Sequence, residues 1–255
     1  MSFELREVAL VYPSRAGAVR ALDGVTLAIA GGERVALLGP SGAGKSSLLK
    51  LFNATARPTA GAIRFEGRRL AALAGSDLRA VRRRIGTVFQ QPSLVPSLTA
   101  LQNALCGHLG SWSLARSLRA LLAAAPSDTR VALAALKTVG LLDKAAARAD
   151  ELSGGQQQRV AIARVLVQDP EVVLTDEPFA SLDPGLTAQL ADLLLHVAQG
   201  RTLIAALHDV ELALAHFPRI VGLRGGRVAF DAKAAEVSPQ MLRELYAHEA
   251  RGAIG

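Results

Sequence analysis

GPSGAGKS, the stretch from Gly39 to Ser46, decides the fold class of this chain. It fits the pattern G-x-x-x-x-G-K-[ST], in which the backbone N–H groups of a glycine-rich loop surround the phosphates of a nucleotide. Residues 33–38 before it have the composition of a short buried strand, and residues 46–52 after it begin a helix with an apolar stripe. Because the pattern has chemical meaning only between a strand and a helix, this context favours a phosphate-binding loop over a chance glycine-rich turn.

The residue types in the loop each supply part of the expected chemistry. Gly42 and Gly44 permit backbone conformations that a side chain would forbid, so that successive N–H groups can point into one concavity. A helix that starts near Lys45 presents unpaired N–H groups and about half a positive charge to an anion. Lys45 would reach the β- and γ-phosphates, and the Ser46 hydroxyl would ligate Mg²⁺. The predicted nucleotide contacts in this loop are Gly39, Pro40, Ser41, Gly42, Ala43, Gly44, Lys45, Ser46 and Ser47.

The composition is that of a globular protein with a large core. Half of the 255 residues are apolar, which suits one large domain or one domain that carries a smaller lobe. No apolar run approaches the roughly 18 residues that a membrane span needs, and residues 1–7 lack the pattern of a signal peptide. We therefore expect a cytoplasmic protein. The single cysteine, Cys106, leaves no internal disulfide and is interpreted as a half-buried thiol.

The charge balance is basic, with a formal net charge of +7 and a pI of about 10.3. Such a balance suits anionic partners: a nucleotide, a nucleic acid or the cytoplasmic face of a membrane. Arginines on predicted helix surfaces would produce the same balance without any such partner. The charge alone therefore does not choose between these alternatives.

Strand signals toward both ends of the chain predict an α/β protein. Residues 3–12, 19–29 and 62–67 indicate an antiparallel sheet at the edge of the core. Residues 85–89, 171–175 and 202–207 predict further strands, with helices over 184–199 and 210–216. A hairpin over 220–230 turns at Gly225-Gly226, and Pro239 opens a last amphipathic helix.

The middle of the chain has a different character. From Gln91 to about Lys144 the sequence consists of polar turns and alanine- and leucine-rich helices, without a credible strand. Ser127-Asp128 is predicted as the N-cap of a helix over 131–139, which Gly140 ends. This stretch is interpreted as a helical insertion into the α/β domain.

Two carboxylates, Asp176 and Glu177, directly follow the buried strand at 171–175. Ligands of parallel α/β sheets lie just beyond the C-terminal ends of the strands. Asp176 is therefore placed to hold Mg²⁺ through water, and Glu177 to polarise the water that attacks the γ-phosphate. Acids that merely cap the next helix before Pro178 are the alternative, and the presence of the phosphate loop argues against it.

Two further side chains end predicted strands. His208 follows the strand at 202–207, where it could hydrogen-bond the γ-phosphate and orient the water, although a lone histidine is more often a structural residue. Gln90 follows the strand at 85–89, and its amide can reach Mg²⁺ or water while it joins the core to the helical insertion.

A second glycine site begins another helix at Leu152-Ser153-Gly154-Gly155-Gln156. The serine hydroxyl and the glycine N–H groups at a helix start form an anion site. Since one domain cannot easily direct two such sites at one phosphate, this site is expected to serve a nucleotide bound to another subunit.

Together these stretches resemble, in order, the motifs of ABC-type ATPases. The matching motifs are the phosphate loop, Gln90, residues 152–156, Asp176-Glu177, Ser181-Leu182-Asp183 and His208. The resemblance covers nearly the whole chain and implies a P-loop NTPase core with an antiparallel β subdomain and an inserted α-helical subdomain. It divides the chain into residues 1–90 (core and phosphate loop), 91–165 (helical subdomain with the Ser-Gly-Gly motif) and 166–255 (remainder of the core).

The resemblance also implies an assembly. Two ATPase subunits, a homodimer or a pair, would lie head to tail, with ATP between Lys45 of one subunit and Ser153, Gly154 and Gly155 of the other. Tyr12 looks like the aromatic residue that stacks on adenine, and a solvent-facing tyrosine at a strand end is the alternative. Asp183 would lie at the dimer seam and couple the two sites.

A finer resemblance links the chain to the ATPase subunits of phosphonate importers. It rests on residues 82–91, 148–159, 207–213 and 221–227, while Phe179 and Ala232 depart from the usual pattern of that group. It implies uptake of a phosphonate or related phosphorus oxyanion, powered by ATP and Mg²⁺ at the cytoplasmic face of the inner membrane. Partners would be transmembrane permease subunits and, indirectly, a substrate-binding protein, with no nucleic acid. An importer of polar amino acids or metal ions is one alternative, and an ABC protein acting on nucleic acid or ribosomes is another.

Overall fold

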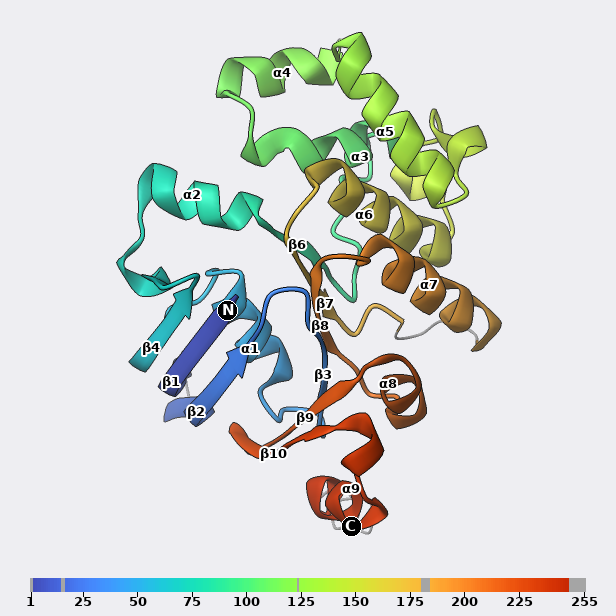
Figure 1. The fold of residues 1–255 in the computed structure, drawn as a ribbon. Coiled ribbons are helices and arrows are strands. Elements are labelled where there is room, and N and C mark those ends of the chain that lie inside the picture. Colours follow the sequence, from blue (N-terminus) through green and yellow to red (C-terminus); the bar gives the residue numbers. More distant parts are fainter. Residues whose placement is uncertain (1, 15–16, 123, 180–183, 248–255) are drawn as a thin grey trace. The chain divides into compact units, whose positions relative to one another are not determined.

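The computed structural model describes residues 2–14, 17–122, 124–179 and 184–247, and Figure 1 shows their arrangement into helices and strands. Contacts divide the chain into two compact units. The first consists of Met1–Leu78, Leu174–Glu177 and Arg201–Gly255, and the second of Arg79–Val173 and Pro178–Gly200.

An antiparallel sheet forms the N-terminal part of the first unit, as predicted. Its strand order is β2 (Gly17–Ile29), β1 (Phe3–Ser14), β4 (Ala60–Phe65) and β5 (Arg68–Arg69). The buried residues of β1 are Phe3, Leu5, Val8 and Leu10, with a shift in register between Leu5 and Val8. The Phe3 ring lies 4.6 Å from the Phe52 ring and 4.9 Å from the Phe65 ring. This aromatic cluster ties the sheet to helix α1 (Lys45–Phe52).

The second sheet of the first unit carries the strands that precede the predicted site residues. Its order is β10 (Arg227–Lys233), β9 (Arg219–Arg224), β3 (Arg34–Leu38), β8 (Thr202–Ala206) and the end of β7 (Val172–Asp176). Strand β3 runs parallel to both β8 and β9, so the C-terminal ends of these strands lie at one edge. Every residue of β8 is buried, which agrees with the predicted apolar run.

Helices complete this unit. Helix α1 follows β3, α8 (Val210–His216) follows β8, and α9 (Pro239–Tyr246) follows β10. The β9–β10 hairpin turns at Gly225 and Gly226, whose φ angles of 55° and 77° explain why glycine is needed at both positions.

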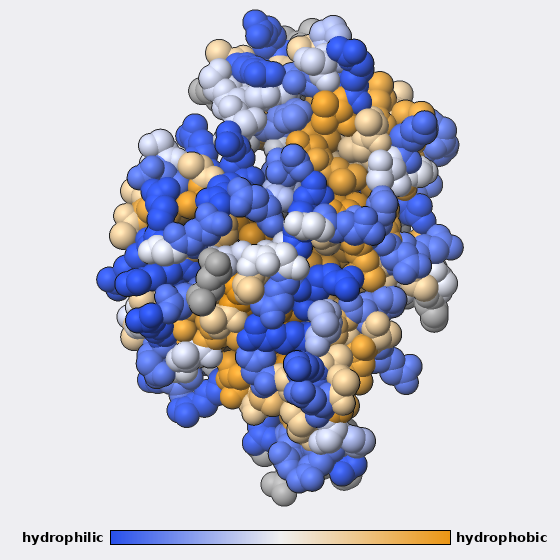
Figure 2. Space-filling view, viewed as in Figure 1, coloured by the Kyte–Doolittle hydropathy of each residue, from blue (hydrophilic) through white to orange (hydrophobic). Residues whose placement is uncertain are grey.

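The second unit is mainly helical (Figure 1), as the sequence predicted for the middle of the chain. Strand β6 (Ile85–Val88) lies beside the start of β7. The helices are the end of α2 (Gly75–Arg83), α3 (Ala100–Leu105), α4 (Leu114–Leu122), α5 (Pro126–Thr138), α6 (Gly154–Gln168) and α7 (Pro184–Val197). Helix α6 packs against both α3 and α5, and apolar side chains gather over α5 and α6 in Figure 2.

One predicted helix start is wrong. Helix α5 begins at Pro126 with Ala125 in the N-cap position, so Ser127 and Asp128 lie in the first turn and do not cap it. Proline has its φ angle preset for a helix and lacks an N–H that would need a cap, and it therefore starts the helix earlier than the capping signal suggested. The predicted helix end is confirmed, since Gly140 adopts a φ of 72° just beyond Thr138.

Across the part of the chain that the structure describes, no helix combines the length and the apolar character that crossing a membrane requires.

Candidate nucleotide-binding site

The phosphate loop connects β3 to α1, as predicted, and its glycines are required by the backbone. Gly42 and Gly44 have φ angles of 75° and 105°, in the left-handed region that favours glycine. A Cβ at Gly39 would lie 2.1 Å from the Leu223 carbonyl oxygen, and one at Gly44 would lie 2.6 Å from the Ala21 carbonyl oxygen. Only glycine therefore fits at these two close approaches, whereas Gly42 faces open space.

The side chain of Lys45 folds back into the loop that precedes it. Its ammonium group is almost fully buried and donates hydrogen bonds to the carbonyl oxygens of Gly39, at 2.6 Å, and Pro40, at 3.3 Å. Glu177 Oε1 lies 3.8 Å from the same Nζ atom. Lys45 thus places a buried cation against the predicted phosphate loop, and ammonium groups form strong, charge-assisted hydrogen bonds with phosphate oxygens.

Ser46 and Asp176 meet across the site. The Ser46 hydroxyl donates a hydrogen bond of 2.9 Å to Asp176 Oδ1, which joins the first turn of α1 to the end of β7. Burial raises the pKa of the Asp176 carboxyl above its ordinary value, and the Ser46 hydrogen bond only partly opposes this effect. A half-buried carboxylate beside a hydroxyl is a pair of oxygen ligands of the kind that Mg²⁺ prefers.

No cluster of three or more histidine, cysteine, aspartate or glutamate ligands exists within the described ranges of the chain. In nucleotide sites Mg²⁺ usually keeps several waters and is held by one or two carboxylates together with phosphate oxygens.

Glu177 and His208 form the third pair of the site. His208 Nε2 lies 2.7 Å from Glu177 Oε1, within hydrogen-bond distance. Glu177 adopts a φ of 47°, which is uncommon for a residue with a side chain, and its N–H donates to the Ala206 carbonyl oxygen at 3.0 Å. Strained backbone of this kind persists only where its surroundings hold it, and it is concentrated at functional sites.

The first unit thus brings together Lys45, Ser46, Asp176, Glu177 and His208, which the sequence placed at the ends of three separate strands. One support of the loop was missed by the sequence analysis. The N–H of Gly226 donates to the Ala43 carbonyl oxygen at 3.1 Å, so the β9–β10 hairpin braces the phosphate loop. No sequence signal reveals this contact, because the two residues are far apart along the chain.

Tyr12, the predicted adenine contact, lies in β1 opposite Val19. Its hydroxyl oxygen is buried and has no hydrogen-bond partner among the residues that the structure describes. Tyr12 as a whole is half-buried, and its role as the adenine contact stays a prediction. Ser181, Leu182 and Asp183 lie outside the described residues.

The second unit carries the Ser-Gly-Gly site at the start of α6. Ser153 is the N-cap residue, and its hydroxyl accepts a hydrogen bond of 3.4 Å from the Gln156 N–H in a reciprocal capping box. A Cβ at Gly154 would meet no atom within 4 Å, whereas one at Gly155 would lie 2.4 Å from Leu186 Cδ2. The two glycines therefore differ, because Gly154 borders open space and Gly155 packs against α7.

Gln90, in the same unit, is an exposed residue two positions after the end of β6. Its backbone is attached to α6, since Gln158 Nε2 donates a hydrogen bond of 3.1 Å to the carbonyl oxygen of Phe89.

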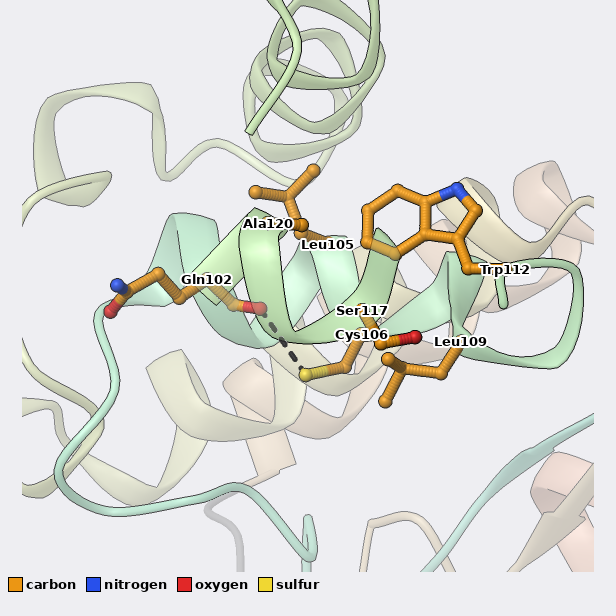
Figure 3. A pocket seen from close by; sticks show the side chains of 7 residues that line it. All are labelled: Gln102, Leu105, Cys106, Leu109, Trp112, Ser117 and Ala120. Atoms are coloured by element: carbon orange, nitrogen blue, oxygen red, sulfur yellow. Dashed lines mark hydrogen bonds between the residues drawn. The ribbon is translucent and has the colours of Figure 1, made fainter. Parts of the chain in front are cut away.

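A small apolar pocket between α3, α4 and the 3-10 turn Cys106–Gly110 belongs to a different part of the second unit (Figure 3). The Cys106 thiol lines it and donates to the Gln102 carbonyl oxygen at 3.3 Å, and burial raises the pKa of that thiol. The predicted half-buried thiol is confirmed. With a volume of about 10 Å³ the pocket holds no more than about one water molecule.

Comparison with known proteins places this geometry in a family. The family model described as ABC transporter matches residues 22–180. The chain belongs to the ABC transporter family. It is an ATP-binding protein of the ABC type, and its fold is that of an ABC ATPase.

Curated relatives in the ABC transporter family share about half of the residues. A phosphonates import ATP-binding protein of Pseudomonas entomophila is 48% identical over 254 residues, which cover 99% of this chain and 94% of the relative. A protein of the same name from Anaeromyxobacter dehalogenans is 52% identical over 230 residues. These cover 90% of this chain but 46% of that relative, so the chain spans about half of its length.

Solved structures from the ABC transporter family have the same fold. An ATP-binding cassette in a dimeric, post-hydrolysis state with ADP and phosphate matches with a TM-score of 0.80 and 33% identity, over 91% of this chain and 98% of that chain. A component of an ABC transporter complex from Clostridium perfringens matches with a TM-score of 0.77 and 29% identity, over 98% and 96% of the two chains.

Proposed function

We propose that this chain is the ATP-hydrolysing subunit of an importer that takes up phosphonates or related phosphorus oxyanions. One observation supports the ATPase activity. In the first unit, five side chains lie within contact distance of one another as a connected group: Lys45, Ser46, Asp176, Glu177 and His208. Relatives that are about half identical over most of the chain are named phosphonates import ATP-binding proteins, and these names support a phosphonate as the transported substrate.

The phosphate end of ATP would bind in the loop from Gly39 to Ser47. The backbone N–H groups and the buried ammonium of Lys45 would neutralise the phosphate charges, and Tyr12 would stack on the adenine. Mg²⁺ would be held by Ser46, Asp176 and the amide of Gln90, where it supplies charge neutralisation at the β- and γ-phosphates.

Glu177 is assigned the role of general base toward the attacking water. Its carboxylate is anchored by His208, so one oxygen is fixed while the other is available to accept a proton. His208 would also donate a hydrogen bond to the γ-phosphate, which orients the water along the line of attack.

The assembly is also a proposal. A second ATPase subunit would contribute Ser153, Gly154 and Gly155 to the nucleotide. These three residues would belong to its helical subdomain, residues 91–165, while residues 1–90 and 166–255 would form its nucleotide-binding core. Transmembrane permease subunits would bind the chain at the cytoplasmic face of the inner membrane, with a substrate-binding protein acting through them. The phosphonate would contact those partners and not this subunit.

The decisive test of the ATPase activity is the substitution Glu177→Gln. We expect this variant to bind ATP and form the dimer, but to hydrolyse ATP at least about a hundredfold more slowly than the unchanged chain, since an amide cannot accept the proton. Phosphate release and equilibrium nucleotide binding measure the two properties separately. Hydrolysis by Glu177→Gln at the normal rate would remove Glu177 from this role.

The substrate is tested in the assembled transporter. The chain is purified with its permease and binding-protein partners, and ATPase activity is measured with a phosphonate, a polar amino acid or a metal ion. We expect the phosphonate to stimulate ATPase activity. If a polar amino acid or a metal ion stimulated it instead, the proposed substrate would be wrong, but the proposed ATPase activity would still hold.

A further inference from the structure

Helix α6 holds the segment that carries Gln90 through a series of side-chain bonds to backbone carbonyls. Gln168, at the C-terminal end of the helix, donates to the carbonyl oxygens of Arg82, Arg83 and Ile85 at 3.0–3.3 Å. Gln158 and Arg164 extend the series past the end of β6. The segment therefore depends for its conformation on the same helix that begins with Ser153-Gly154-Gly155.

Gln158 is the member of this series nearest to Gln90. Its side chain is almost fully buried, at 2% exposure, although a neutral amide is costly to bury without partners. Its Nε2 donates a hydrogen bond of 3.1 Å to the carbonyl of Phe89, the peptide group that links Phe89 to Gln90. Holding this peptide plane fixes the direction in which the Gln90 side chain leaves the backbone.

Arg164 holds the other side of Gln90. Its Nη2 and Nη1 atoms donate to the carbonyl oxygens of Pro92, at 3.1 Å, and Ser93, at 3.0 Å. Ser93 has a φ of 49°, an uncommon and strained value for a residue with a side chain. Gln158 and Arg164, six residues apart on α6, thus hold the backbone on both sides of Gln90.

We propose that Gln158 and Arg164 are positioning residues for ATP hydrolysis, which hold Gln90 in its working orientation and make it move together with Ser153-Gly154-Gly155. This inference rests on the proposed function of Gln90. It follows from the geometry that a side chain one turn after Gly154 bonds directly to the peptide before Gln90. The two predicted nucleotide contacts of the second unit then form one rigid piece.

A double-mutant cycle tests this proposal. Gln158→Met keeps the length and volume of the side chain but removes the donor, and it is combined with Gln90→Ala. We expect Gln158→Met to lower kcat about tenfold and to raise the Mg²⁺ concentration needed for half-maximal activity, while the loss of one buried hydrogen bond lowers the Tm by a few degrees without unfolding the chain. The double variant should be no slower than Gln90→Ala alone, within about twofold. Losses that multiply would overturn the proposal.

Gln157→Met is the matched control. Gln157 is the adjacent residue of the same type. Its amide donates to the carbonyl oxygens of Ala149 and Leu152, which are not part of the segment around Gln90. We expect this variant to leave kcat and the Mg²⁺ dependence within about twofold of the unchanged chain. An equal effect of both substitutions would mean that Gln158 is merely structural and would overturn the proposal.

A second variant and a measurement that needs no ATPase activity keep the proposal testable. If Gln158→Met fails to fold, Arg164→Lys, which cannot bond both carbonyls at once, takes its place in the same cycle. Amide hydrogen exchange of residues 89–94 requires no catalysis, and it should accelerate in Gln158→Met but not in Gln157→Met. An unchanged chain without ATPase activity would contradict the proposed function, whereas equal exchange in the two variants would contradict the positioning role.

Discussion

At the scale of single residues, Asp176 combines its proposed function with a cost in stability. Burial raises the pKa of its carboxyl above the ordinary value of 3.8. An acid with a raised native pKa holds its proton more tightly in the folded state, so the free energy of unfolding falls as the pH rises from 3.8 through the native pKa. The full cost is present only at pH values above the native pKa. We therefore expect Asp176→Asn to raise the Tm of the nucleotide-free chain by about 2 °C while it abolishes Mg²⁺-dependent hydrolysis.

Thermal unfolding and phosphate release measure these two effects. Asp143→Asn is the control, since Asp143 is exposed and its removal should leave the Tm unchanged. A lower Tm in Asp176→Asn would show that the charged carboxylate stabilises the empty site and would contradict the interpretation.

At the scale of elements, the two glycines at the start of α6 differ in their surroundings, and the proposed function gives only Gly154 an open side toward a nucleotide. An added Cβ at Gly154 meets open space, whereas one at Gly155 collides with Leu186 on α7. We expect Gly154→Ala to keep or raise the Tm, because alanine favours a helix over glycine by about 1 kcal/mol. Its ATPase rate should fall at least about tenfold, since the methyl group obstructs a phosphate at the helix start.

Gly155→Ala provides the comparison, because it must displace Leu186 and should lower both the Tm and the ATPase rate. Calorimetry and steady-state kinetics on the two variants separate packing from function. Normal ATPase activity in Gly154→Ala would exclude this glycine from contact with the nucleotide.

At the scale of the whole molecule, the proposed head-to-tail dimer makes each active site from two chains. Lys45→Met and Gly154→Ala should each be nearly inactive alone. In a mixed dimer, one site carries both changes and the other carries neither. If pairing is random and the sites act independently, an equimolar mixture should recover about a quarter of the normal ATPase rate. Activity that stays at the average of the two separate variants would contradict a site shared between subunits.

The local predictions succeeded where one short segment contains the whole cause. The hairpin at Gly225-Gly226, the helix that follows the phosphate loop and the end of α5 at Gly140 all depend on residues within a few positions of one another. The prediction of where α5 starts was wrong for a local reason too. Two start signals overlap there, and Pro126 begins the helix before the Ser127-Asp128 pair that was predicted to cap it.

The sequence by itself determined the family of the chain and which residues are proposed to carry the chemistry, because residue type and spacing define a phosphate loop, a pair of carboxylates and a capped helix start. The tertiary structure alone decided how they meet. Ser46 bonds Asp176 from 130 positions away, and Gln158 bonds the Phe89 carbonyl from 69 positions away. Such contacts depend on the order of strands in a sheet and on the packing of helices. Periodicity along the chain does not encode these arrangements, because it records only which face of each element is buried.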